Sequence, residues 1–287
     1  MMPLMLLPWP SVFQSMIKRI KKFYTHLSHK LFLTKREKFG LIVGVLTGGL
    51  LLIQVLGPNF RYHLIIGLAV LTYVLFVWGL WEDLNGIEWL TLFILPITYV
   101  IAMPLFYFLL PVRWLTRLPI DIIFAVGIYA ILLIENIYNV AAERTIQLLR
   151  AAHSVGLFLT LFTLFLLLNI IFSLHLPFAE NFILIFIIYS LLSLQCLWAM
   201  KLEPKISWQL FIYCLIISLI GGELAIIFSF WPIQTIIESL FLTTIFYSLV
   251  GMIQQYLVER LFHRTVTEFI SVSVVVFILV LITTIWG

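Results

Sequence analysis

Long apolar runs constrain this chain more than any other feature of its sequence. Runs of about 20 residues with few charges recur along it, separated by short segments rich in Pro, Gly or charged residues. Lipid offers backbone groups no hydrogen-bond partners, so uninterrupted apolar runs of this length must be helices, whereas a β-barrel would alternate apolar and polar residues. The sequence therefore predicts an all-α fold, a polytopic transmembrane helical bundle.

We expect about nine spans in one domain. The spans are predicted at residues 38–57, 61–81, 88–110, 119–140, 153–173, 180–200, 207–230, 232–256 and 268–286. A mean hydropathy of +1.15 over 287 residues exceeds what a water-soluble core with a polar coat can reach. No repeat, low-complexity linker or soluble domain is evident, so residues 38–287 are predicted to form a single transmembrane domain.

The distribution of Lys and Arg predicts the orientation, because cytoplasmic loops retain basic residues. With the N-terminus inside, 14 of the 17 basic residues fall on the cytoplasmic side, and only Arg61, Arg113 and Arg117 fall outside. The expected location is therefore a prokaryotic-type cell membrane, with a cytoplasmic N-terminus and the C-terminus outside.

Residues 1–37 are predicted to be a basic arm on the membrane surface. Within residues 12–31, apolar residues such as Phe13, Ile17 and Ile20 recur every three or four positions, and basic residues occupy the other face. Such an amphipathic helix lies in the headgroup plane and is attracted to anionic lipids. The predicted partners are thus a bilayer with anionic lipids and possibly a membrane protein, but no nucleic acid.

Gly40, Gly44 and Gly48 lie at four-residue spacing in the first span. Small residues at this spacing let two helix backbones approach closely, which favours helix packing in lipid. We expect the packing partner to be another span of the same chain, and a second protein is the alternative.

A polar stripe follows the fourth span, formed by Glu135, Asn136, Asn139, Glu143 and Arg150 at helical spacing. Residues 120–169 contain no proline, so the chain is expected to stay helical and bend at the cytoplasmic surface through an amphipathic linker. The sequence favours a helix end whose acids meet water and pair with Arg144 or Arg150. A polar vestibule for an ion or headgroup is the alternative.

Glu223 and Glu238 flank the Trp231-Pro232 turn and form a candidate intramembrane acid pair. Antiparallel helices would bring them to similar depths, about 12 and 10 Å below the turn. A shared cleft would make the pair functional, whereas separate hydrogen bonds would make it structural. Pro96, Pro104 and Gly221-Gly222 are expected to interrupt helices near this pair.

Searches for chemical motifs are negative, so no catalytic residue, metal site or cofactor is predicted. Cys196 and Cys214 fall inside spans and are expected to be buried. The sequence favours a non-enzymatic membrane component that packs with partner proteins or lipid. The alternative is a small-solute or proton-coupled transporter centred on the third, seventh and eighth spans. A more distant third is a lipid-modifying membrane enzyme that uses Arg113, Arg117 and Asp121.

Overall fold

Nine long helices make up the described part of the chain, and each is long and apolar enough to cross a membrane. The structure, a computed structural model, describes residues 34–56, 60–81, 84, 86–111, 114–142 and 147–284, with backbone only for 114–116. The helices are α2 (Lys35–Val55), α3 (Arg61–Leu80), α4 (Glu88–Tyr107), α5 (Trp114–Ala141), α6 (Leu149–Ser173), α7 (Phe178–Lys201), α8 (Trp208–Ser229), α9 (Thr235–Leu257) and α10 (His263–Thr283). The prediction of nine spans is confirmed for these residues, and the predicted surface helix at 12–31 lies outside them.

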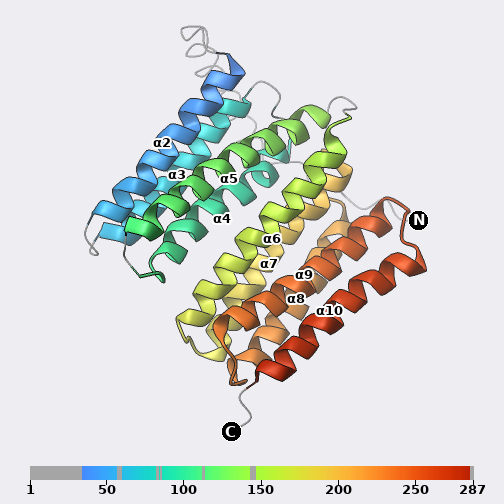
Figure 1. The fold of residues 1–287 in the computed structure, drawn as a ribbon. Helices are drawn as coiled ribbons and strands as arrows, with labels where there is room; N and C mark the ends of the chain where they lie inside the picture. The colour runs from blue at the N-terminus through green and yellow to red at the C-terminus, as the bar shows by residue number, and fades with distance from the viewer. Residues whose placement is uncertain are drawn as a thin grey trace.

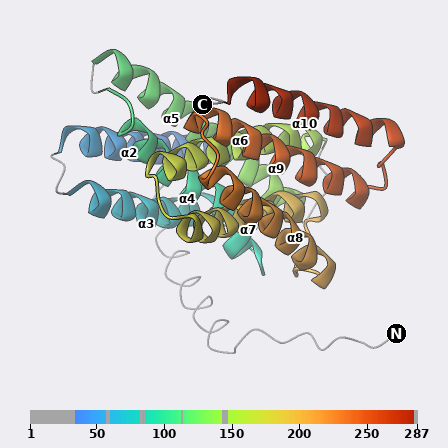
Figure 2. The ribbon, with the colours of Figure 1, turned by 90° about the horizontal axis from the view of Figure 1, so that it is seen from below.

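The helices form an elongated bundle in which α6 and α7 lie between two groups (Figures 1 and 2). Helices α2, α3, α4 and α5 form a ring, because α2 and α4 each contact both α3 and α5. On the other side α8 and α9 pack against α7 and against each other, and α10 packs on α9 at the edge. Two apolar cores result, one centred on the ring and one on α6–α9.

Glycine and tyrosine set the close packing of α7 against α8. A Cβ atom at Gly221 would overlap the ring of Tyr189, and one at Gly222 would lie 2.7 Å from Cε2 of Phe182. Helix α8 continues unbroken through both glycines, and α4 continues through Pro96. The expected interruptions at these positions are therefore wrong. In α8 the glycines allow close approach to α7 instead.

Helices α5 and α6 form an antiparallel pair, which corrects the expectation of one continuous helix from 120 to 169. Helix α5 ends at Ala141 and α6 begins at Leu149. A continuous helix that only bends cannot bring its second half back along the first, and these two helices contact each other. The chain therefore reverses between them without proline or glycine.

Eight of the ten described Lys and Arg residues lie at one end of the bundle. They are Lys35, Arg36, Lys38, Arg150, Lys201, Lys205, Arg260 and Arg264. We call this the basic end. The other two, Arg61 and Arg117, lie at the opposite end, where α3 begins and where the spanning part of α5 begins.

Candidate functional site: an enclosed acid and amide pair

The most deeply enclosed acid of the described chain is Glu135 on α5, which is 0% exposed. The Nε2 atom of Gln195 on α7 donates a hydrogen bond of 2.5 Å to its Oε1, and Gln195 is 3% exposed. Each residue lies six positions before the basic end of its helix, about 9 Å along the helix axis. Helix α6 lies between α5 and α7 in sequence and runs antiparallel to both. Helices α5 and α7 therefore run in the same direction, and Glu135 and Gln195 lie at the same depth.

Among the described residues, two oxygen atoms of this pair have no hydrogen-bond partner. They are Oε2 of Glu135 and Oε1 of Gln195, and both are inaccessible to solvent. A carboxylic acid and a primary amide can form two hydrogen bonds in a ring, one from the amide N–H and one from the acid O–H. The hydrogen bond that is present is the one from the amide N–H of Gln195. The two unpartnered oxygens are the atoms that the second bond would join.

Further polar side chains tie the surrounding helices together near this pair. The Nδ2 atom of Asn139 donates to the carbonyl of Leu80 at 3.0 Å, which joins α5 to α3. The hydroxyl of Tyr138 donates to the carbonyl of Ala152 at 3.0 Å. His153 Nε2 lies 2.8 Å from the carbonyl of Ala199, which can only accept, so Nε2 carries the proton. Together these hydrogen bonds link α5 to α3, α5 to α6 and α6 to α7 near the acid and amide pair.

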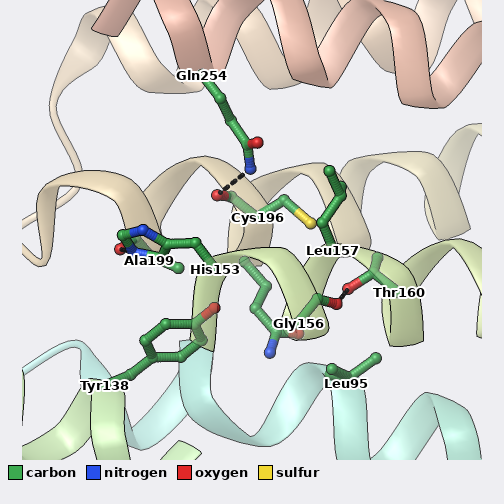
Figure 3. A pocket seen from close by; sticks show the side chains of 10 residues that line it. Leu95, Tyr138, His153, Gly156, Leu157, Thr160, Cys196, Ala199 and Gln254 are labelled. Atoms are coloured by element: carbon green, nitrogen blue, oxygen red, sulfur yellow. Dashed lines mark hydrogen bonds between the residues drawn. The ribbon is translucent and has the colours of Figure 1, made fainter. Parts of the chain in front are cut away.

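A small cavity lies beside the pair, between helices α4, α5, α6, α7 and α9 (Figure 3). Tyr138 and Leu95 close it from one side, and Gln254 reaches toward it from α9 on the other side. Gln254 Nε2 donates to the carbonyl of Cys196 at 3.1 Å. The cavity leaves about 10 Å³ for the centre of a water molecule, which is enough for about one water. Gln195 lines this cavity and bonds to Glu135, so the carboxyl adjoins it through one side chain.

The predicted polar stripe is divided by the structure. Glu135 and Asn139 are 0% exposed, whereas Asn136 is partly exposed and Arg150 is exposed. Glu143 lies outside the described residues. The expectation that the acid of this stripe meets water is therefore wrong for Glu135, because α6 packs against α5 and Gln195 of α7 bonds to the carboxyl group.

The two acids of the other candidate site have different surroundings. Glu223 is exposed on α8, whereas Glu238 on α9 is 5% exposed. In the described part of the chain neither carboxyl group has a hydrogen bond or an ion pair, and neither lines the cavity beside Gln195. A shared cleft for Glu223 and Glu238 stays a prediction.

The glycine face of α2 points away from the rest of the bundle. A Cβ atom at Gly40, Gly44 or Gly48 would meet nothing within 4 Å. The opposite face, with Ile42, Leu46 and others, is buried against the ring. None of the described residues packs against these glycines, so the expected packing within the chain is not observed there.

Sequence reasoning missed Gln195, the partner of Glu135. The available signal was an amide in the middle of an otherwise apolar run, which in lipid requires a polar neighbour. It also missed the pairing of Gln54 with Asp121, whose Nε2–Oδ1 distance is 2.7 Å. Cys196 and Cys214 are buried, as expected. No three His, Cys, Asp or Glu side chains gather as metal ligands in the described ranges.

The fold and the enclosed acid and amide pair define a multi-span helical membrane protein with a polar centre inside its bundle. The chain belongs to the family DUF5656, which is described as a protein of unknown function. The family model matches residues 42–283. The match runs through all nine described helices. No curated protein and no solved structure matches the chain.

Proposed function

We propose that the chain is a proton-coupled transport protein in which Glu135 carries the proton. The observation that supports this most is the complete enclosure of Glu135 in a membrane span with a single amide partner. Ionisable residues inside membrane bundles are costly and commonly mark ion or proton pathways. The sequence placed this class of function at the third, seventh and eighth spans, and the geometry favours α5 and α7 instead.

The acid and amide pair supplies a chemical reason for coupling. A free carboxylate enclosed without a cation would cost several kcal/mol. A proton on Oε2 of Glu135 removes the negative charge. The resulting O–H group can donate a hydrogen bond to Oε1 of Gln195, which would give both oxygens a partner. When the proton leaves, the charge requires water or a cation. Proton release would therefore favour an open arrangement, and proton uptake would favour the closed one.

A pocket at the basic end is the proposed entrance toward this pair. A surface pocket of about 440 Å³ is lined there by Lys201, Gln209, Tyr256, Leu257, Glu259 and Leu261. Helices α7 and α9 contribute to both this pocket and the cavity beside Gln195. Gln254 lies on α9 two residues before Tyr256, and its bond to Cys196 ties the two helices together. We assign Gln254 the role of closing this route.

Proton flux into proteoliposomes tests the proposal. A potassium diffusion potential drives protons, and a pH-sensitive dye inside the vesicles reports their entry. We expect flux above that of empty vesicles for the unaltered protein, and a fall to the empty-vesicle level for Glu135→Gln. Glu223→Gln and Glu238→Gln are matched controls, because each removes one acid from a span, and both should retain flux.

The outcomes separate the hypotheses. Unchanged flux in Glu135→Gln, with the protein folded, would remove Glu135 from any pathway. Loss of flux in Glu223→Gln and Glu238→Gln instead would support the acid pair. Flux no greater than that of empty vesicles for the unaltered protein would favour the second candidate function.

The second candidate is a non-enzymatic component that packs with a partner protein or lipid. Two observations on the described residues support it: α10 is only 6% buried over its most apolar window, and none of them lies within 4 Å of a Cβ atom at Gly40, Gly44 or Gly48. Crosslinking in membranes from cysteines introduced at Gly44 and at Val275, an exposed residue of α10, tests it. A specific adduct from either position supports a partner, and the absence of adducts from both contradicts one.

A further inference from the structure

A second polar cluster closes the end of the α2–α5 ring that lies opposite to the basic end. Each helix of the ring contributes to it from its terminal turns or, for α5, from the start of its spanning part. The members are Gln54 on α2, Arg61 on α3, Tyr107 and the adjoining Phe108 on α4, and Arg117 with Asp121 on α5. This cluster plays no part in the proposed proton route.

Arg61 holds a positive charge without a counter-charge among the described residues. Its guanidinium lies 4.5 Å from the centre of the Phe108 ring, and Arg61 is half-buried. Within the described residues it has no hydrogen bond or ion pair, and its Nε is inaccessible and unpartnered. This contact with the aromatic ring limits the motion of the guanidinium. Its N–H groups can therefore serve as donors to a planar or tetrahedral anion.

The start of α3 strengthens the attraction for an anion. Arg61 is the first residue of this 20-residue helix, and the preceding residue, Phe60, provides no side-chain cap. The first backbone N–H groups of a helix lack partners inside the helix and carry a partial positive charge. An anion bound by Arg61 would thus also face these groups.

Acceptor atoms lie at the same end of the ring. Gln54 is 6% exposed and donates to Asp121 at 2.7 Å, but its own Oε1 is buried without a partner. Arg117 donates from Nε to the hydroxyl of Tyr107 at 3.1 Å and attracts Asp121 electrostatically. The Gln54 oxygen therefore needs a donor that the described side chains do not supply.

We propose that this cluster binds the phosphate of a phospholipid whose headgroup carries hydrogen-bond donors. Arg61 and the start of α3 bind the phosphate oxygens, and Oε1 of Gln54 accepts from an ammonium or hydroxyl of the headgroup. All members lie where spans end, which is the depth of lipid phosphates in a bilayer. A phosphate requires a cation and N–H donors, and both are present at the end of the ring where Oε1 of Gln54 has no partner among the described residues.

Native mass spectrometry of the detergent-solubilised full chain tests this site. Phosphatidylethanolamine and phosphatidylcholine are the probes, because they share the phosphate and net charge but only ethanolamine has N–H donors. We expect one lipid bound per chain, with phosphatidylethanolamine retained at least several-fold better. Arg61→Gln should reduce retention of both lipids about tenfold, whereas Arg260→Gln, at the basic end, should change neither.

Two further variants and a competition experiment separate the possible outcomes. Gln54→Met should abolish the preference for ethanolamine and keep phosphate binding. Inorganic phosphate in place of lipid distinguishes a free phosphate site from a lipid site, because a lipid site should show no saturable competition by it. If Arg61→Gln does not fold, Phe108→Leu removes the ring under the guanidinium and should weaken both lipids. Equal retention in the unaltered protein and in folded Arg61→Gln or Phe108→Leu would refute the site, as would equal losses in Arg260→Gln.

Discussion

Replacing Gly221 by alanine tests the packing that holds α8 against α7. The added Cβ would overlap the Tyr189 ring and lie 2.9 Å from its Cγ. That ring cannot easily yield, because Tyr189 is 0% exposed and its hydroxyl donates to the Leu242 carbonyl at 2.7 Å. Overpacking of this kind costs about 1–3 kcal/mol. The loss of the tyrosine hydrogen bond adds about 1 kcal/mol if the ring moves.

A gain in helix propensity opposes this cost. Alanine is favoured over glycine inside a helix by up to about 1 kcal/mol. The net expectation for Gly221→Ala is a loss of about 1–3 kcal/mol in the free energy of unfolding. Gly44→Ala is the matched control, since its Cβ would meet nothing within 4 Å. It gains the same propensity without overlap and should be neutral or more stable by up to about 1 kcal/mol.

Unfolding of both variants in detergent micelles measures the difference. Denaturation by increasing fractions of sodium dodecyl sulfate, followed by circular dichroism, gives the free energies. The double variant Gly221→Ala with Tyr189→Leu should lose less than the sum of the two single losses, because the smaller side chain relieves the overlap. Equal stability of Gly221→Ala and Gly44→Ala would show that Tyr189 does not lie against α8 as described.

Two contacts in the bundle interior and the distribution of basic residues can be tested in the same preparations or in cells. Gln195→Leu removes the donor to the enclosed Glu135 and should lower the free energy of unfolding by about 1–3 kcal/mol; the same denaturation series measures it, and an unchanged transition would contradict the pair. Cys196 and Cys214 are 6% and 2% exposed, so both should react with a maleimide far more slowly in micelles than after denaturation; rapid labelling of the folded protein would argue against their burial. The distribution of basic residues predicts that a C-terminal alkaline phosphatase fusion is active and a fluorescent protein fusion is dark; the reverse pattern would invert the topology.

The number and approximate limits of the spans are determined by the sequence alone. Whether a run of about 20 residues can cross a bilayer depends on its own transfer free energy, which is a local property. Helix α7, expected at residues 180–200, is observed at Phe178–Lys201. That Cys196 lies away from water follows from the same local property, since a small apolar residue inside a span rarely faces water.

Only the tertiary structure decides which face of each span points inward. In water an apolar face indicates the core, but in lipid both faces of a helix are apolar, so hydropathy does not distinguish them. The glycine face of α2 was therefore expected inside the chain, yet it points outward. Glu135 was expected at the water interface, yet it is 0% exposed, because α6 packs against α5 and Gln195 of α7 bonds to the carboxyl group. Its partner Gln195 is 60 residues away in sequence, and only the packing of α6 against both α5 and α7 brings the acid and the amide together.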